Sequence, residues 1–398
     1  MQINTPTLII EIKNSEYIFV VGENNEDNNF KLLYKNIIQT SLTNDNKIFD
    51  YESIYKVLKK NIYLIEQKFN FTFKETILIL NNFECSFSNF TGFKKLNGSQ
   101  LTKENVSYIL NSLKSKINEL EKNKTILHIF SSKYNLDQKS VENLPIGLFG
   151  DFYSQELTFF LINSNDLKNF NNIFNRCNLR IKKILLKSFV EGVNLINKNS
   201  LETFFKIVIK KDYSELIFFE NSALKFTQYF NFGSDIIIKD ISKITSLKTE
   251  VVKKLISNST FRSESFEQNI NEKYFENGNF RKIKKKLIYD IARARIQEMA
   301  NLILLNNINF TGFFKKMRSV YLKIDDQMNL SCFDDSFEKS FSKKSFYKIK
   351  LIQENLSAKD SIYHDANKIA HFGWKKEAIP VTQNKHSFIS GIFRSFFE

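Results

Sequence analysis

The sequence predicts a duplicated α/β protein of several subdomains, from its length, its composition and an internal repeat. The chain has 398 residues, too many for one ordinary core and suited to about two to four subdomains. It is 42% hydrophobic, which provides enough apolar side chains for packed cores and argues against global disorder. One order of elements, strand–turn–strand–strand–helix, occurs twice, roughly 195 residues apart.

The first copy of this order begins near the N-terminus. Residues 7–12 (TLIIEI) and 17–21 (YIFVV) flank a short turn, which is typical of a hairpin. Residues 30–40 fit a third strand, about 50–68 have apolar residues at helical spacing, and 76–80 (TILIL) read as a buried strand.

The second copy follows the same order. Strands are expected at 204–209 (FFKIVI), 216–219 (LIFF) and 223–232, with phenylalanines that face a core, and a helix is expected at 234–247. Two such copies indicate a duplicated α/β architecture.

Two segments interrupt the copies. The first, about 84–162, has expected strands at 90–96, 125–130 and 156–162, and a helix that Thr102 opens, with Asn105 as its capping partner. Further helices fit 166–177 and 189–197. The second insert, about 241–308, reads as largely helical, and its main helix, 280–305, is long and basic.

Composition excludes several classes of function. The formal charge is +15, but the basic residues are scattered and no nucleic-acid-binding motif occurs, so no nucleic-acid partner is expected. Cys85, Cys177 and Cys332 are far apart, no CxxC occurs and the four histidines do not cluster, which predicts reduced thiols and no metal site. No signal peptide and no apolar run of ~18 residues is seen, so no spanning helix is expected.

The C-terminal residues form an amphipathic pattern. Phe388, Ile389, Ile392, Phe393, Phe396 and Phe397 would share one face of a helix, with Ser390, Arg394, Ser395 and Glu398 opposite. Residues 376–387 are polar and include Pro380, which favours a linker. We therefore expect a membrane anchor in which Arg394 adds attraction to anionic lipid. A helix docked on the protein's own core or in a partner's groove is the alternative.

Several motifs, in order over nearly the whole chain, resemble the FtsA family of bacterial cell-division proteins. Residues 145–150 (PIGLFG), followed by Glu156 and Leu157, resemble its DP(V/I)G(M/L)xG…LEV signature, and 101–106 (LTKENV) resemble a helix start, ITxxDV. Residues 232–241 (FGSDIIIKDI) resemble VGGDHITNDIA, 247–255 match the start of subdomain 2B, and 289–299 (YDIARARIQEM) resemble EIIxPRVEEI. An amphipathic C-terminal peptide is also a hallmark of the family.

The resemblance implies a two-lobed actin-like fold, that is, a duplicated ribonuclease H-like fold. The first lobe would contain subdomain 1A (1–83 and 163–195) with an inserted 1C subdomain of the SHS2 type (84–162). The second would contain subdomains 2A (196–240 and 309–375) and 2B (241–308). A linker (376–385) and the membrane-targeting amphipathic helix (386–398) would follow.

The resemblance also implies a function. Family members link the FtsZ ring to the cytoplasmic face of the inner membrane at the division site, form filaments and help to recruit later division proteins. Subdomain 2B receives the C-terminal peptide of FtsZ, for which the candidate cations are Lys284, Lys285, Arg293 and Arg295. The structural alternative is that Arg293 or Arg295 pairs with Glu298 on the same helix.

The nucleotide motifs depart from the family pattern. Family members hold ATP and magnesium with two glycine-bearing hairpins and a glycine-rich adenosine loop, because glycine lets backbone amides approach phosphates. Here Lys13 stands where glycine is expected, Lys210, Lys211 and Asp212 occupy the second loop, and Ile324 and Asp325 the third. We expect no catalytic residues, no hydrolysis, weak or absent ATP binding and thus no cofactor. Asp325 with Asp326 is expected to be a solvated turn rather than a metal pair.

Other functions remain open. The chain could be another actin-like assembly protein, such as the pilus protein PilM, which would not need a membrane-binding tail. An active ATPase of the sugar-kinase or chaperone type would need the phosphate loops that this chain lacks. A structural domain without these activities is the remaining possibility.

Overall fold

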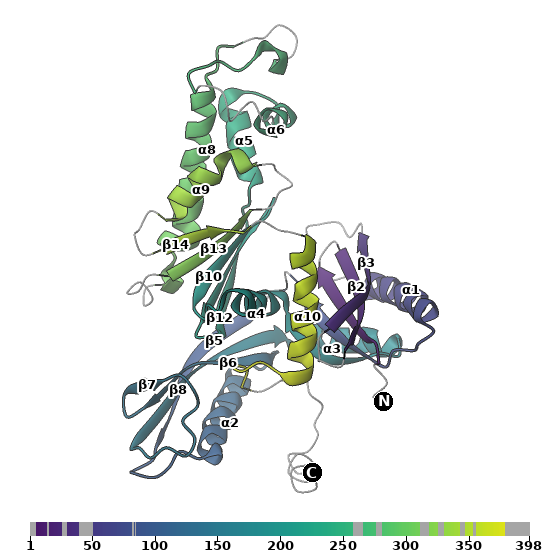
Figure 1. Cartoon of the computed structure of the whole chain (residues 1–398), viewed down its shortest axis with the longest axis vertical. Coiled ribbons are helices and arrows are strands. Elements are labelled where there is room, and N and C mark those ends of the chain that lie inside the picture. The colour runs from purple at the N-terminus through teal and green to yellow at the C-terminus, as the bar shows by residue number, and fades with distance from the viewer. Residues whose placement is uncertain are drawn as a thin grey trace. The chain divides into compact units, whose positions relative to one another are not determined.

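The computed structural model describes residues 5–13, 16–25, 30–39, 51–81, 83, 85–257, 266–275, 281–310, 318–324, 330–342, 347–352 and 356–378. The chain divides into two compact units (Figure 1). Unit 1 comprises Met1–Glu202, Glu220–Lys225 and Asn355–Glu398, and unit 2 comprises Thr203–Phe219 and Phe226–Glu354.

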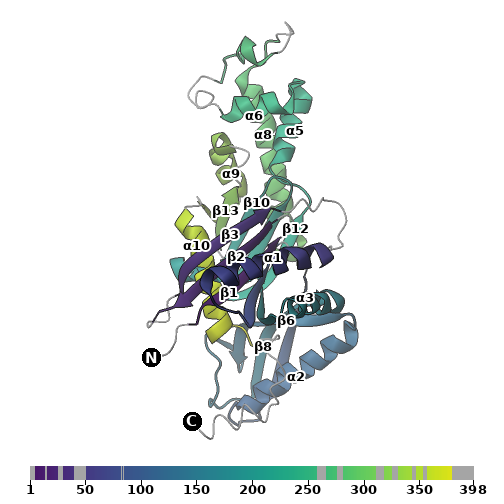
Figure 2. The same ribbon diagram turned by 90° about the vertical axis from the view of Figure 1, so that its right-hand side faces the viewer.

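Unit 1 contains a five-stranded mixed sheet with the order β3-β2-β1-β4-β9. Its strands are β1 (Thr7–Lys13), β2 (Glu16–Asn24), β3 (Phe30–Gln39), β4 (Glu75–Leu80) and β9 (Arg180–Leu186). β1 is antiparallel to β2 and parallel to β4. The sheet lies between α1 (Tyr51–Phe69) with α3 (Ser164–Arg176) on one side and α10 (Leu356–Phe372) on the other (Figure 2). α4 (Lys187–Asn199) packs on α10. Helices on both faces explain why β1 and β4 are nearly continuous apolar runs.

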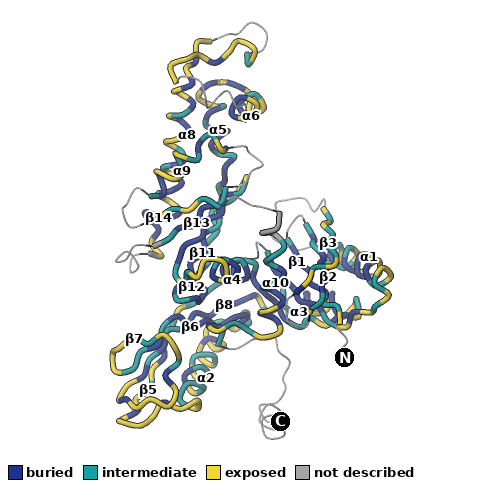
Figure 3. Tube along the Cα trace, viewed as in Figure 1, coloured by how far each residue is buried: buried dark blue, intermediate teal, exposed yellow. Residues whose placement is uncertain are grey.

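Unit 2 contains a second five-stranded sheet with the order β12-β11-β10-β13-β14. Its strands are β10 (Phe204–Ile209), β11 (Ser214–Glu220), β12 (Ala223–Phe230), β13 (Arg318–Ile324) and β14 (Tyr347–Leu351). When the strands of each sheet are numbered by their order in the sequence, both sheets have the spatial order third, second, first, fourth, fifth. The predicted duplication is therefore confirmed. The phenylalanines of β10 and β11 are core residues, and their strands are dark blue in Figure 3.

A third sheet, of four antiparallel strands, belongs to the segment that was predicted as the first insert. Its order is β5-β8-β6-β7, with β5 (Ser86–Lys95), β6 (Lys124–Leu136), β7 (Lys139–Val141) and β8 (Phe152–Asn163). α2 (Lys103–Leu120) packs on it and has the predicted start, because the Thr102 side chain caps the Asn105 amide and Asn105 caps Thr102 in return. A side chain at Gly92 would come within 2.2 Å of Ile109, so glycine allows this close packing.

The second insert contains α6 (Thr249–Ser257) and α8 (Lys285–Ala300), and α5 (Asp235–Thr245) leads into it. α9 (Asp334–Phe341) follows the insert in the chain and packs on α8. The predicted helix over 280–305 is shorter than expected. Residues just before Lys285 pair instead with an extended segment, in which the Ile270 amide donates a hydrogen bond to the Ile283 carbonyl. After Ala300 the helix continues as a π-helical turn, Asn301–Leu305.

The last described helix also corrects the predicted subdomain boundary at residue 375. α10 was expected in the second lobe, but it belongs to unit 1 and packs on α4 and β3. Its Tyr363, Ala366 and Ile369 are buried, and Asp365 accepts a hydrogen bond from Asn194 of α4 at 2.5 Å. Among the described residues, no helix is both long and apolar enough to cross a membrane.

Candidate nucleotide, peptide and membrane sites

The first predicted phosphate loop is the β1–β2 hairpin of unit 1. The strand ladder ends at the pair Lys13 and Glu16, whose side chains form an ion pair of 3.3 Å. Residues 14 and 15 lie outside the described residues. The Lys13 ammonium, where family members have glycine, is therefore directed to a carboxylate of its own hairpin.

Behind this hairpin, the carboxylate of Glu11 lies in a cluster of hydrogen-bond donors. Lys187 Nζ, at the start of α4, lies 2.6 Å from Glu11 Oε2, and the hydroxyl of Tyr363 on α10 donates to the same oxygen at 3.1 Å. Asn81 Nδ2, directly after β4, donates to Glu11 Oε1 at 2.7 Å. Burial, and then the nearby Glu11 charge, raise the pKa of Tyr363, so its hydroxyl stays protonated and donates.

The resemblance described above implies ATP with magnesium, and the Glu11 cluster does not fit that metal. Mg²⁺ needs oxygen ligands with available lone pairs in octahedral geometry. Here each oxygen of Glu11 already accepts from a donor, and its side chain is only 2% exposed. The ammonium, phenol and amide groups around it present hydrogens, not lone pairs.

The second predicted phosphate loop is the β10–β11 hairpin of unit 2. The Lys210 amide donates to the Tyr213 carbonyl at 2.9 Å, which closes the turn around Lys211 and Asp212. The Lys210 and Lys211 carbonyls accept hydrogen bonds from the amides of Ser234 and Asp235, both at 2.8 Å. Amides at the start of a helix can bind phosphate, but these two at the start of α5 are occupied by the hairpin.

The third predicted loop follows β13, which ends at Ile324. Asp325 and Asp326 lie outside the described residues, so the expected solvated turn stays a prediction.

The four cations predicted to bind the FtsZ peptide do not form one cluster in unit 2. Lys284 pairs with Glu267 at 2.7 Å, and Lys285 is only 6% exposed, where burial lowers its pKa. Arg295 pairs with Asp240 and also with Glu298 at 2.6 Å, as the structural alternative anticipated for this residue. Arg293 is exposed and makes no ion pair among the described residues.

Residues 374–378, here called the C-terminal strap, dock on β6 of unit 1, although a linker was predicted from 376. The Ser131 amide donates to the Lys376 carbonyl at 2.9 Å, and the Ala378 amide donates to the Ile129 carbonyl at 2.7 Å. The Glu377 side chain is 1% exposed and contacts His128 Nδ1 and Lys183 Nζ, each at 2.7 Å. Burial opposes ionisation of Glu377, but the His128 and Lys183 interactions outweigh it and lower its pKa.

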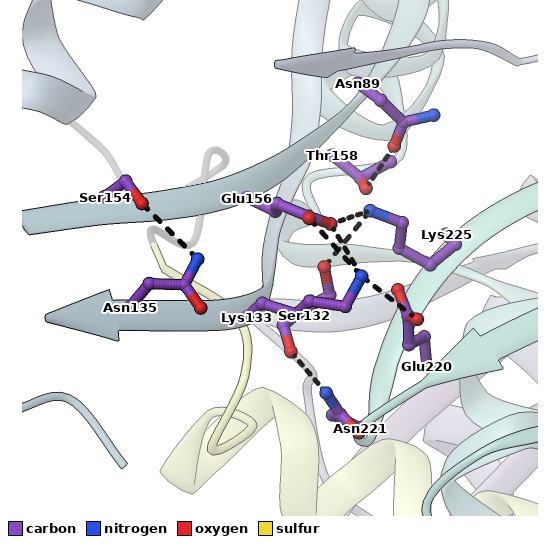
Figure 4. A network of polar contacts seen from close by, with 10 residues as sticks. All are labelled: Asn89, Ser132, Lys133, Asn135, Ser154, Glu156, Thr158, Glu220, Asn221 and Lys225. Carbon is purple, nitrogen blue, oxygen red and sulfur yellow. Dashed lines mark hydrogen bonds and ion pairs between the residues drawn. The ribbon is translucent and has the colours of Figure 1, made fainter. Parts of the chain in front are cut away.

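A second polar network, which the sequence did not predict, lies on the four-stranded sheet of unit 1 (Figure 4). Lys133 lies 3.3 Å from both Glu156 and Glu220, and Lys225 lies 3.5 Å from Glu156. Asn221 donates to the Ser132 carbonyl at 2.9 Å. Two lysines and two glutamates thus balance one another and tie residues 220–225 to β6 and β8.

A cavity of about 480 Å³ lies in unit 1 between α2, the sheet and the C-terminal strap. Gln155 Nε2 and Ser131 Oγ line it, are buried and have no hydrogen-bond partner within the described part of the chain. Val106 and Leu110 of α2 supply an apolar wall. The cavity is therefore suited to a group that combines apolar atoms with a hydrogen-bond acceptor. Sequence patterns gave no signal for it, because its lining residues come from distant segments.

The predicted membrane-binding residues, Phe388 to Phe397, all lie outside the described residues. The structure shows only that the chain reaches residue 378 bound to unit 1 through the C-terminal strap. The predicted anchor helix stays a prediction.

The sequence is similar to curated cell division proteins over part of its length. No protein-family model matches the chain. It is 21% identical over 239 residues to the cell division protein FtsA of Buchnera aphidicola subsp. Baizongia pistaciae, covering 60% of this chain and 56% of the relative. It is 20% identical over 195 residues to FtsA of Escherichia coli K12, covering 48% and 46%. The chain thus spans about half the length of the curated relatives it matches.

A solved structure is also similar to this chain over nearly its whole length. The PilM–PilN type IV pilus biogenesis complex contains a chain that matches with a TM-score of 0.55 at 10% identity, covering 92% of this chain and 98% of that chain. At this identity the match establishes the fold alone. Together with the two duplicated sheets, these similarities show that the chain has the actin-like ATPase fold.

Proposed function

We propose that this protein is a non-enzymatic cell-division adaptor that links FtsZ to the cytoplasmic face of the inner membrane. The observation that carries the proposal is the similarity to FtsA proteins over 60% of the chain, in a molecule of actin-like fold. The amphipathic sequence at 386–398 supplies a means of membrane attachment. On this proposal the protein is peripheral at the division site, self-associates into filaments and contacts later division proteins.

The proposed anchor would bind reversibly as a single copy. Each large apolar side chain contributes about 1.5–3 kcal/mol on full burial, but insertion at an interface is partial and ordering of the peptide opposes it. Several anchors on one filament would bind far more firmly through avidity. Membrane attachment would thereby depend on assembly.

Sedimentation with anionic vesicles tests the anchor. Phe393→Glu with Phe396→Glu should leave the protein soluble and abolish co-sedimentation, because both charges fall on the apolar face. Ser390→Glu with Ser395→Glu is the matched control, since it adds the same charge to the opposite face and should retain much of the binding. Equal sedimentation of the first variant and the unaltered protein would disprove the anchor.

The proposed FtsZ-peptide site is on the helical insert, where Arg293 of α8 is an exposed cation without an ion pair among the described residues. A peptide site of this kind combines an apolar groove with cations for carboxylates. Arg293→Glu should weaken binding of an FtsZ C-terminal peptide without unfolding, whereas Lys285→Glu would also disturb packing because Lys285 is buried. Lys116→Glu, an exposed reversal on α2, is the control. Equal affinities of the Arg293→Glu and Lys116→Glu variants would move the site elsewhere.

A PilM-type scaffold is the second candidate. The structural match to the PilM–PilN complex over 92% of the chain favours it. Deletion of 386–398 distinguishes the two, because a scaffold of this type would keep its localisation and assembly, while the proposed adaptor would leave the membrane. Pull-down of FtsZ by the full chain gives an independent answer.

We also propose that the family's ATPase activity is lost. The occupied α5 amides and the donor-filled Glu11 cluster support this, because these groups already have partners within the described part of the chain. A calorimetric titration should detect weak or no ATP binding in the presence of magnesium. Micromolar affinity would contradict the proposal.

A further inference from the structure

The Glu11 cluster of unit 1 has its own positive charge. We infer that Lys187 is a built-in cation, whose ammonium group neutralises the hairpin carboxylate in the way a bound divalent metal would in a nucleotide site. This inference deepens the proposed loss of ATPase activity and rests on it. It concerns the residues of this chain alone.

The geometry matches a permanent counter-ion. Lys187 Nζ lies 2.6 Å from Glu11 Oε2, and the two side chains are 13% and 2% exposed, respectively. Charge-assisted hydrogen bonds of this length are stronger than neutral ones, and screening by salt is weak where solvent is excluded. The ion pair therefore persists without any added ligand.

The remaining donors complete the carboxylate's coordination. Tyr363 donates to the oxygen that contacts Lys187, and Asn81 donates to the other oxygen. A carboxylate is an acceptor only, so three donors on its two oxygens leave little capacity for a metal. A cation entering this site would have to displace Lys187.

The cluster also joins three elements of unit 1. Glu11 lies on β1, Lys187 begins α4, and Tyr363 lies on α10. An ammonium that is covalently part of the chain cannot dissociate, so these elements stay joined whether or not nucleotide is present. The Glu11 end of β1 is thus held in place without metal or nucleotide.

Thermal unfolding of the full chain, with and without millimolar Mg²⁺ or Mn²⁺, tests the inference. The unaltered protein should show no Tm shift with either ion. Lys187→Met should lower Tm by roughly 6–20 °C, because it strands a buried carboxylate, and should regain part of the loss with Mn²⁺. Lys187→Met with Glu11→Gln should recover much of the Tm and lose the Mn²⁺ response.

Lys13→Met is the matched control, since it removes a lysine from the same hairpin whose ion pair is partly exposed. It should shift Tm little and confer no response to Mn²⁺. If Lys187→Met does not fold, Glu11→Gln alone tests the pair, because it strands the buried ammonium and should lower Tm without conferring a response to either ion.

Three results would overturn the inference. These are a divalent-ion stabilisation of the unaltered protein, no Mn²⁺ response of a folded Lys187→Met variant, and no loss of Tm in Glu11→Gln. Vesicle and FtsZ-peptide binding measured on the same variants below their Tm report on the proposed adaptor function. Failure there, with the Tm results as expected, would reject the function and leave the built-in cation in place.

Discussion

Glu377→Gln should destabilise unit 1 by releasing the C-terminal strap. Glu377 is 1% exposed and is the common partner of His128 and Lys183, so its neutralisation leaves the Lys183 ammonium, itself 4% exposed, without its carboxylate. Removal of one partner of a buried pair costs about 3–5 kcal/mol. At roughly 2–4 °C per kcal/mol for a unit of this size, Tm should fall by roughly 6–20 °C.

Amide hydrogen exchange shows which part of unit 1 Glu377→Gln destabilises. The Ser131 amide donates to the Lys376 carbonyl, so its exchange should accelerate more than that of amides in β1. Lys375→Met is the control, because Lys375 is about half exposed and its pair with Glu202 should contribute at most about 1 kcal/mol. If Glu377→Gln and Lys375→Met behave alike, the buried triad does not hold the strap.

The buried Glu377 carboxylate also makes the stability of the strap depend on pH. The pKa of Glu377 is lowered in the folded protein from its ordinary value of 4.5. A carboxyl group with a lowered folded pKa contributes stability above its unfolded pKa and loses it as pH falls through the folded value. The difference in Tm between the unaltered protein and Glu377→Gln should therefore be constant near neutrality and shrink below about pH 4.5. A difference that persists unchanged in acid would refute this.

Substitutions at four further positions probe other parts of the fold. Gly233→Ala should lower the free energy of unfolding in urea by about 1–3 kcal/mol or more, because the new Cβ would lie 2.3 Å from the Lys210 carbonyl oxygen and 2.5 Å from that of Lys211. An unchanged urea midpoint would contradict this contact with the hairpin. Thr102→Ala should cost about 1 kcal/mol through loss of the α2 cap, and Thr102→Ser should cost less. Lys225→Met should lower the free energy of unfolding less than Glu220→Gln does. Burial lowers the pKa of Lys225, so its ammonium is poorly compensated, whereas Glu220 helps to raise the pKa of Lys133 against burial. The reverse order of the two variants would refute this.

The sequence predicted elements whose signals are local. Apolar runs at 7–12 and 204–209 became β1 and β10, and Thr102 with Asn105 became a capping box. The duplicated order was visible because each copy keeps the same strand spacing. By contrast, the start of α8 was misjudged, because 281–284 have helical character in sequence but pair with 266–270 in the fold.

Contacts between distant segments carried no sequence signal. Glu11 and Lys187 are 176 residues apart, and Lys183 and Glu377 are 194 residues apart. Each of these residues alone reads as an ordinary surface charge. Burial converts them into matched ion pairs, and only the fold shows which charges become buried together.

The two hairpins show why loss of glycine does not mean loss of order. Lys13 and Lys210 occupy equivalent places, each as the last residue before the turn of the first hairpin in its sheet. In unit 1 the charge near the hairpin is balanced by Lys187, and in unit 2 the hairpin carbonyls bind the first amides of α5. The Glu11 carboxylate and the first amides of α5 thus have partners within their own units, through different chemistry. Since buried polar groups without partners are costly, a hairpin that had merely lost its ligand would be left with unpaired groups. The internal partners observed here instead indicate a fold that is stable without one.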